Sequence, residues 1–136
     1  MVRARVCVLV VIAIAATGCG GHSGEVKAAV ATAESWLKLM DAGKPESAAM
    51  AEGALKDALF NDPQAVSRPR NTTLGSPTER KLVSAEYSDQ PAAGSGQGEF
   101  VNIKYSTKYN QLSSGSETVT LVKDKDGWKV IGYQAD

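Results

Sequence analysis

The fold is decided by residues 98–133, which read GEFVNIKYSTKYNQLSSGSETVTLVKDKDGWKVIGY. Residues 98–109, 116–123 and 128–133 are rich in Val, Ile, Thr and Tyr, and apolar and polar side chains alternate along them, as in half-buried β-strands. The polar connections are short enough only for antiparallel neighbours, and an Asp-Gly pair before the last segment is a hairpin signal. The stretch therefore predicts an antiparallel meander. A similar segment at residues 80–88 is the expected first strand.

One face of this meander is expected to pack on helices. In residues 98–109 the alternate set that begins at Val101 is continuously apolar, whereas the set that begins at Phe100 includes Asn102 and Lys104. The residues predicted to point inward are Val101, Ile103, Tyr105, Val119, Leu121 and Val130. Side chains of this size, facing a helix, fill a gap of about 10 Å. The sequence thus predicts a mostly filled interior without a ligand cavity.

The helices precede the strands. A first helix is predicted over residues 25–42, with Ser23 as its N-cap and Gly43 just beyond its end. Its apolar stripe consists of Val26, Val30, Ala33, Leu37 and Met40, and Trp36 beside it is expected in the core together with Trp128. A second helix is predicted from Pro45 to Phe60, with Ala49, Leu55, Leu59 and Phe60 on its buried side.

A short third helix is expected from Pro63, although Pro69 would remove a hydrogen bond inside it. The predicted fold class is therefore α+β, with two to three N-terminal helices packed on a curved four-stranded antiparallel sheet. Residues 25–136 form the single expected domain. This is the plan of the cystatin-like and NTF2-like folds, which host enzymes, binders and structural modules alike.

Residues 1–18 have the anatomy of a secretory signal peptide. Arg3 and Arg5 form a positive start, residues 6–16 are almost entirely apolar, and small residues precede Cys19. The apolar run is shorter than the roughly 20 residues that a membrane-spanning helix needs. We therefore expect this segment to be removed on export.

Ala16-Thr17-Gly18-Cys19 resembles the bacterial lipobox, with Ala16 where Leu is usual. The resemblance implies that Cys19 carries a diacylglycerol and acyl chains such as palmitate, and that residues 19–24 form a lipidated tether. Gly20, by its resemblance to the sorting pattern, favours the periplasmic face of the outer membrane over the inner membrane. An ordinary secreted protein with an incidental Cys19 is the alternative.

The charge of the mature chain excludes one class of partner. Without Arg3 and Arg5, 13 of the 15 basic residues remain against 15 acidic residues, a formal charge of about −2. No basic run of the kind that binds nucleic acid occurs, so no nucleic-acid partner is expected.

The mature chain resembles the bacterial Domain of Unknown Function 4019 family. The resemblance lies in AESWLKLM at residues 33–40, Leu74-Gly75 followed by RKL at residues 80–82, GEFVNIKYST, ETVTLV and GWKVIGY. It implies a small exported protein with helices followed by an antiparallel meander. Because the family has no assigned activity, the resemblance carries no functional residue to this chain.

No catalytic, cofactor-binding or metal-binding constellation is expected. His22 is the only histidine and is predicted to be solvated in the tether, which leaves no Ser-His or Cys-His pair. Asp124 and Asp126 are interpreted as hairpin-turn residues. Glu86, Glu99 and Glu117 are expected to face water from their strands, and Arg80 to pair with a helix carboxylate such as Glu46 or Glu52, with an anion-binding mouth as the lesser alternative.

Two functional hypotheses follow. The first is a lipid-anchored accessory or protein-interaction module of the cell envelope, bound to the membrane through Cys19 and to an envelope protein partner through its surface. The alternative is a small-ligand-binding periplasmic domain with a pocket between the helices and the sheet. An enzyme is not expected, because the catalytic groups are missing.

Overall fold

The computed structural model describes residues 21–89 and 98–136. The expected signal peptide and Cys19 lie outside the described residues, as do residues 90–97, which the sequence predicts to form an exposed loop rich in Gly and small residues. Among the described residues, no helix is both long and apolar enough to cross a membrane.

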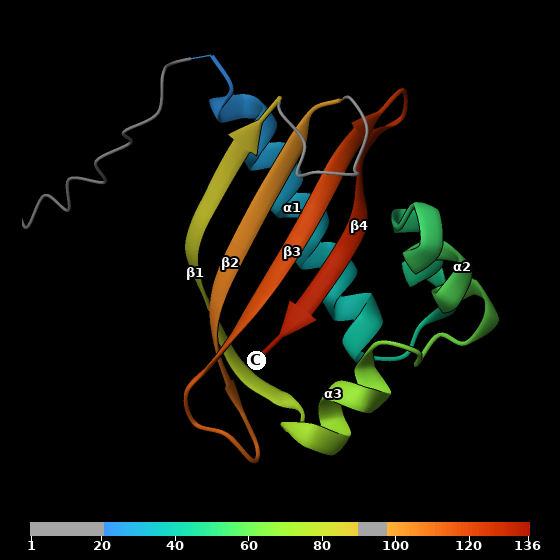
Figure 1. Ribbon diagram of the computed structural model, residues 1–136, viewed down its shortest axis with the longest axis vertical. Helices are drawn as coiled ribbons and strands as arrows, with labels where there is room; N and C mark the ends of the chain where they lie inside the picture. Colours follow the sequence, from blue (N-terminus) through green and yellow to red (C-terminus); the bar gives the residue numbers. More distant parts are fainter. Residues whose placement is uncertain (1–20, 90–97) are drawn as a thin grey trace, which may run out of the picture.

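The described strands form one four-stranded antiparallel sheet in the order β1-β2-β3-β4. The strands are β1 (Pro77–Ser88), β2 (Phe100–Tyr109), β3 (Gly115–Asp124) and β4 (Gly127–Ala135). The long helix α1 (Ser23–Asp41) lies across one face of this sheet (Figure 1). The α+β prediction and the meander are thus confirmed.

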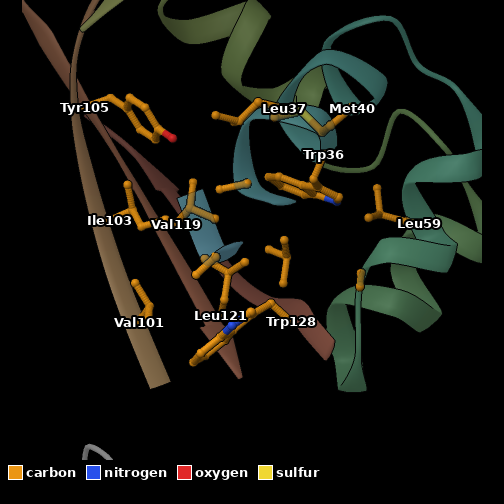
Figure 2. Packing of buried hydrophobic residues seen from close by; sticks show 14 of the residues in the cluster. Trp36, Leu37, Met40, Leu59, Val101, Ile103, Tyr105, Val119, Leu121 and Trp128 are labelled. Carbon is orange, nitrogen blue, oxygen red and sulfur yellow. The ribbon is translucent and has the colours of Figure 1, made fainter. Parts of the chain in front are cut away.

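The interior is filled by side chains from the sheet and from α1 (Figure 2). Val101, Ile103 and Tyr105 are buried, whereas Asn102 and Lys104 are exposed, so the predicted inward face of β2 is correct. Trp36 and Trp128 are buried as expected. The members of the buried cluster are Ala29, Ala33, Trp36, Leu37, Met40, Ala48, Ala51, Leu59, Val101, Ile103, Tyr105, Val119, Leu121, Trp128 and Val130.

The start of α1 differs from its prediction and the end agrees. The helix begins at Ser23 and the N-cap position is His22, so the expectation of Ser23 as N-cap was wrong. At the other end Gly43 has φ +63°, which favours glycine because a Cβ would be crowded there. The Gly43 and Lys44 amides donate to the carbonyls of Met40 and Leu39 at 3.0 and 2.9 Å, which closes the helix in a Schellman motif.

The predicted second helix is two pieces. A 3₁₀-helix, η1 (Pro45–Met50), is followed by Ala51 and then by α2 (Gly53–Asn61). The break occurs because Ala51 pairs with Val130 at the edge of β4, and the Glu52 amide donates to the Val130 carbonyl at 2.9 Å. Gly53, at φ +66°, then redirects the chain into α2.

This break also changes which side chains are buried. Leu59 is fully buried and Leu55 packs against the core, whereas Ala49 is exposed and Phe60 is 79% exposed. The expectation that Ala49 and Phe60 are buried was therefore wrong, because it assumed one continuous helix through Gly53.

The third helix, α3 (Ser67–Thr73), begins four residues after Pro63. Pro69 consequently falls in its first turn, where backbone amides have no intrahelical acceptor. The proline that put this helix in doubt is tolerated for that reason.

Replacing Trp36 by Ala should lower the free energy of unfolding by about 3–5 kcal/mol, because Trp36 has no exposed surface at the centre of the core. Phe60→Ala is the matched control, and its effect should stay within about 0.5 kcal/mol. Urea unfolding followed by circular dichroism measures both. Equal losses for the two variants would contradict the packing described here.

Candidate functional site

The candidate site is a cluster of charged side chains at the end of the domain where α1 terminates. Its four charged members come from four elements: Asp41 is the last residue of α1, Arg70 lies in α3, Arg80 in β1 and Glu117 in β3. We call these four residues, with Thr107 and Tyr133, the charge cluster.

Arg80 is the centre of the charge cluster because it binds both carboxylates in bidentate fashion. Its Nη1 and Nη2 donate to Asp41 Oδ2 and Oδ1 at 2.5 and 3.0 Å. Its Nε and Nη2 donate to Glu117 Oε1 and Oε2 at 2.5 and 2.9 Å. A planar guanidinium suits this geometry, which a lysine could not reproduce.

Arg70 approaches the cluster from the α3 side. Its Nη1 donates to Asp41 Oδ1 at 2.7 Å and to the Tyr133 hydroxyl at 3.2 Å. The Tyr133 hydroxyl in turn donates to Glu117 Oε2, and the Thr107 hydroxyl donates to Glu117 Oε1 at 2.7 Å. Both Glu117 oxygens therefore have neutral as well as charged donors.

The ion pairs of the charge cluster are buried, and an unpaired charge there would strongly destabilise the fold. Glu117 has no exposed surface, and the side chain of Arg70 is almost as buried. Burial opposes the charge of Arg80, but its bonds to Glu117 and Asp41 outweigh that effect and raise its pKa. Burial and the nearby negative charge of Glu117 likewise raise the pKa of Tyr133. The cluster thus holds two positive and two negative groups that satisfy one another.

Arg80 pairs with a helix carboxylate as expected, but the partner is Asp41 at the end of α1 instead of Glu46 or Glu52. The expectation that Glu117 faces water was wrong, because Glu117 points inward and binds Arg80. A signal for Glu117 was present in the sequence, because residues two apart on a strand share a face and Val119 was predicted to point inward.

Glu86 of β1 is exposed, as expected. Glu99 lies just before β2 instead of in a strand, is half-buried, and accepts a hydrogen bond from the Tyr87 hydroxyl at 2.8 Å. That bond, together with burial, raises the pKa of Tyr87 to about 12.

Two surface hollows adjoin the charge cluster. The first is an open groove of about 320 Å³ between α1 and β1, with Leu37, Leu82, Arg80 and Tyr105 among its lining residues. The second, of about 290 Å³, is lined by residues of α3 and β4 that include Arg70 and Tyr133. The prediction of a filled interior holds between α1 and the centre of the sheet. The open groove beside Tyr105 counts against the expectation that no space of ligand size lies there, and it keeps the small-ligand alternative in play.

The opposite end of the domain carries a second set of contacts. The rings of His22 and Tyr87 stack with centroids 3.8 Å apart and planes 6° from parallel. Glu25 accepts hydrogen bonds from Lys123 Nζ at 2.7 Å and from Trp128 Nε1 at 3.1 Å. The bond from Lys123 lowers the pKa of Glu25. His22 is exposed as expected, but it is fixed on the sheet and is not part of a free tether.

Asp124 and Asp126, whose spacing resembles the start of a calcium-binding loop, form the turn between β3 and β4. The Asp126 amide donates to Asp124 Oδ1 at 2.8 Å in the β3–β4 hairpin, as the hairpin interpretation predicted. Over residues 21–89 and 98–136, no three or more His, Cys, Asp or Glu side chains are grouped so that they could hold a metal ion.

Comparison with known proteins gives one match. The family model described as "Protein of unknown function (DUF4019)" matches residues 32–133, a range that contains every member of the charge cluster. No curated protein and no solved structure matches the chain.

Replacing Glu117 by Gln should lower the free energy of unfolding by about 3–5 kcal/mol, because it leaves buried guanidinium charge without its partner. Glu86→Gln is the control, since the same change on an exposed strand position should cost about 0.5 kcal/mol or less. Chemical denaturation of both variants at neutral pH provides the comparison. If Glu117→Gln unfolds like the control, the charge cluster does not stabilise the fold.

Proposed function

The chain belongs to the DUF4019 family, and we propose that it is a lipid-anchored, non-catalytic interaction module of the bacterial cell envelope. In this proposal Cys19 carries the lipid, and the domain binds an extended segment of an envelope protein along β1. The proposal combines the lipobox resemblance with the one strand edge that the described fold leaves open.

That open edge is the observation that carries the proposal. The sheet ends in β1 on one side and in β4 on the other, and the β4 edge is already paired with Ala51 at Val130. In the described part of the chain, no strand pairs with the outer edge of β1. An unpaired edge presents backbone donors and acceptors that an added strand can satisfy.

The side chains on β1 are suited to an apolar partner segment. Leu82 is 50% exposed and Val83 is 61% exposed, which places two large apolar side chains together on the edge strand. A register shift between Leu82 and Ser84 makes Val83 the extra residue of a bulge. Exposed apolar groups next to each other mark interaction surfaces more often than isolated ones do.

The groove between α1 and β1 adds a place for a partner's side chain. Leu37, Leu82 and Tyr105 supply apolar lining, and Glu34 and Lys38 supply charges of both signs. Because the lining charges balance, the favoured occupant is a neutral, apolar side chain of an extended peptide. Strand addition combines backbone hydrogen bonds with such side-chain pockets.

The absence of catalysis is supported by how the charged groups are used. Asp41 and Glu117 are both bonded to Arg80, so these carboxylates are engaged in contacts that hold α1 and the strands together. His22 is stacked on Tyr87 at the other end of the domain from the charge cluster.

One observation favours the small-ligand alternative. Within the described residues the Tyr105 hydroxyl is buried without a hydrogen-bond partner, and Tyr105 lines the groove. A ligand in the groove could supply that partner. Native mass spectrometry of the mature protein distinguishes the cases, because a bound small molecule that Leu82→Trp displaces would establish the alternative.

Cys19→Ser tests the anchor. The variant should remain unprocessed or leave the membrane fraction, because serine offers no thiol for the lipid. Cell fractionation followed by mass measurement of the mature chain gives the result, with Ser23→Ala as a control that should fractionate like the wild type. Membrane association and processing that are unchanged in Cys19→Ser would refute the lipoprotein assignment.

A photo-reactive residue at position 81 tests the β1 edge in cells. It should give an adduct with an envelope protein through one mapped segment, and Val83→Asp should abolish the adduct because it places a charge in the apolar contact. The same probe at position 104, on the exposed side of β2, should give no such adduct. Identical adducts from both positions, or an adduct that survives Val83→Asp, would rule out β1 as the docking surface.

A further inference from the structure

The first residue with tertiary contacts, His22, lies only three positions after Cys19, the expected lipid attachment site. The His22 carbonyl accepts the first backbone bond of α1, from the Val26 amide at 2.9 Å, and the His22 ring stacks on Tyr87 of β1. One turn later, Glu25 is bonded to Lys123 and Trp128, which flank the β3–β4 hairpin. The first residues of α1 are thus fastened to three of the four strands.

These contacts shorten the connection to Cys19. Only Gly20 and Gly21 separate Cys19 from His22. Three peptide units span at most about 11 Å. The expected tether of residues 19–24 would have let the domain reorient freely. The connection from Cys19 to His22 is shorter, and it holds the end of the domain that contains His22 close to the lipid anchor.

We propose that this end of the domain is a membrane-facing surface that rests against phospholipid headgroups. The inference depends on the proposed lipid at Cys19. The surface, which we call the membrane-facing end, comprises the start of α1, the end of β1 and the β3–β4 hairpin, and these lie together at one end of the sheet (Figure 1).

The chemistry of the membrane-facing end fits headgroups better than acyl chains. Among the described residues the large apolar side chains with high exposure are Phe60, Leu82, Val83 and Leu112, and none of them belongs to this end. The exposed charged side chains there include Lys125 and Asp126 at the hairpin tip and Asp89 just after β1, and the exposed residue His22 is polar. Such a mixture contacts the hydrated headgroup layer without inserting into the bilayer.

The proposed orientation on the membrane also determines how far the groove between α1 and β1 lies from the bilayer. Arg80 precedes Tyr87 by seven residues on β1, which corresponds to about 23 Å along the strand. With Tyr87 at the bilayer, the groove and the charge cluster stand away from the headgroups, and the β1 edge faces sideways. A periplasmic segment can therefore reach β1 without competition from lipid.

The test uses the mature chain from Cys19, coupled through this thiol to a maleimide phospholipid in phosphatidylethanolamine and phosphatidylglycerol vesicles. Cys7 belongs to the expected signal peptide, so Cys19 is the single thiol of the mature chain from Cys19 onward. A fluorescent amino acid replaces Lys125 in one variant and Gln111, an exposed turn residue at the other end, in its matched control. Headgroup nitroxide lipids quench fluorophores that lie near the membrane surface.

Quenching should be several-fold stronger at position 125 than at position 111. Inserting ten Gly and Ser residues between Gly20 and Gly21 adds a flexible reach of about 17 Å and should remove most of the difference. Equal quenching at the two positions, or a difference that persists with the insert, would overturn the proposed orientation. Chemical coupling fixes the anchor, so this outcome is separate from that of Cys19→Ser, which tests whether cells attach a lipid.

Discussion

The architecture depends on how a carboxylate without exposed surface is neutralised. Glu117 is held by Arg80 from β1, with further donors from Thr107 of β2 and Tyr133 of β4. An unpaired charge in such a position would cost several kcal/mol, so these groups must come together for the sheet to close over it. Because Arg80 also binds Asp41, the same interaction fixes the end of α1 on the sheet.

This constraint has a functional consequence. In helix-on-sheet folds of this plan, the space between the helix and the wide end of the sheet is where a ligand pocket can form. Here the charge cluster joins the end of α1 to the sheet. Trp36, Leu37 and Met40 of α1 fill the core beside it (Figure 2), and the Met40 sulfur contacts Arg70. The proposed recognition surface is therefore on the exterior, at the β1 edge and the groove beside it.

Much of the fold could be predicted because its signals are local. Period-two alternation fixed the strands and the inward set around Ile103, and Gly43 marked the end of α1. The break at Ala51 could not be predicted, because it exists to pair with Val130, a residue distant in the sequence. The charge cluster was missed for the same reason, since Arg80 and Glu117 are 37 residues apart and meet only through the register of three strands.

Three tyrosines around the charge cluster are buried or partly buried in protein, and their ionisation tests this burial most directly. Burial, with the negative charge of Glu34 or Glu117 nearby, raises the pKa of Tyr105 and of Tyr109 to about 12, and it raises that of Tyr133 as well.

A raised pKa means that the native state favours the protonated phenol. The resulting stabilisation is complete below about pH 10, the pKa of an unfolded tyrosine, and is lost as the pH rises toward 12. In a spectrophotometric titration of the native protein, phenolate absorbance from these three tyrosines should therefore remain absent near pH 10 and appear together with unfolding at higher pH. The same chain in denaturant should titrate near pH 10. Three phenols that ionise near pH 10 in the native protein would show that water reaches these side chains, and the packing around the charge cluster described here would be wrong.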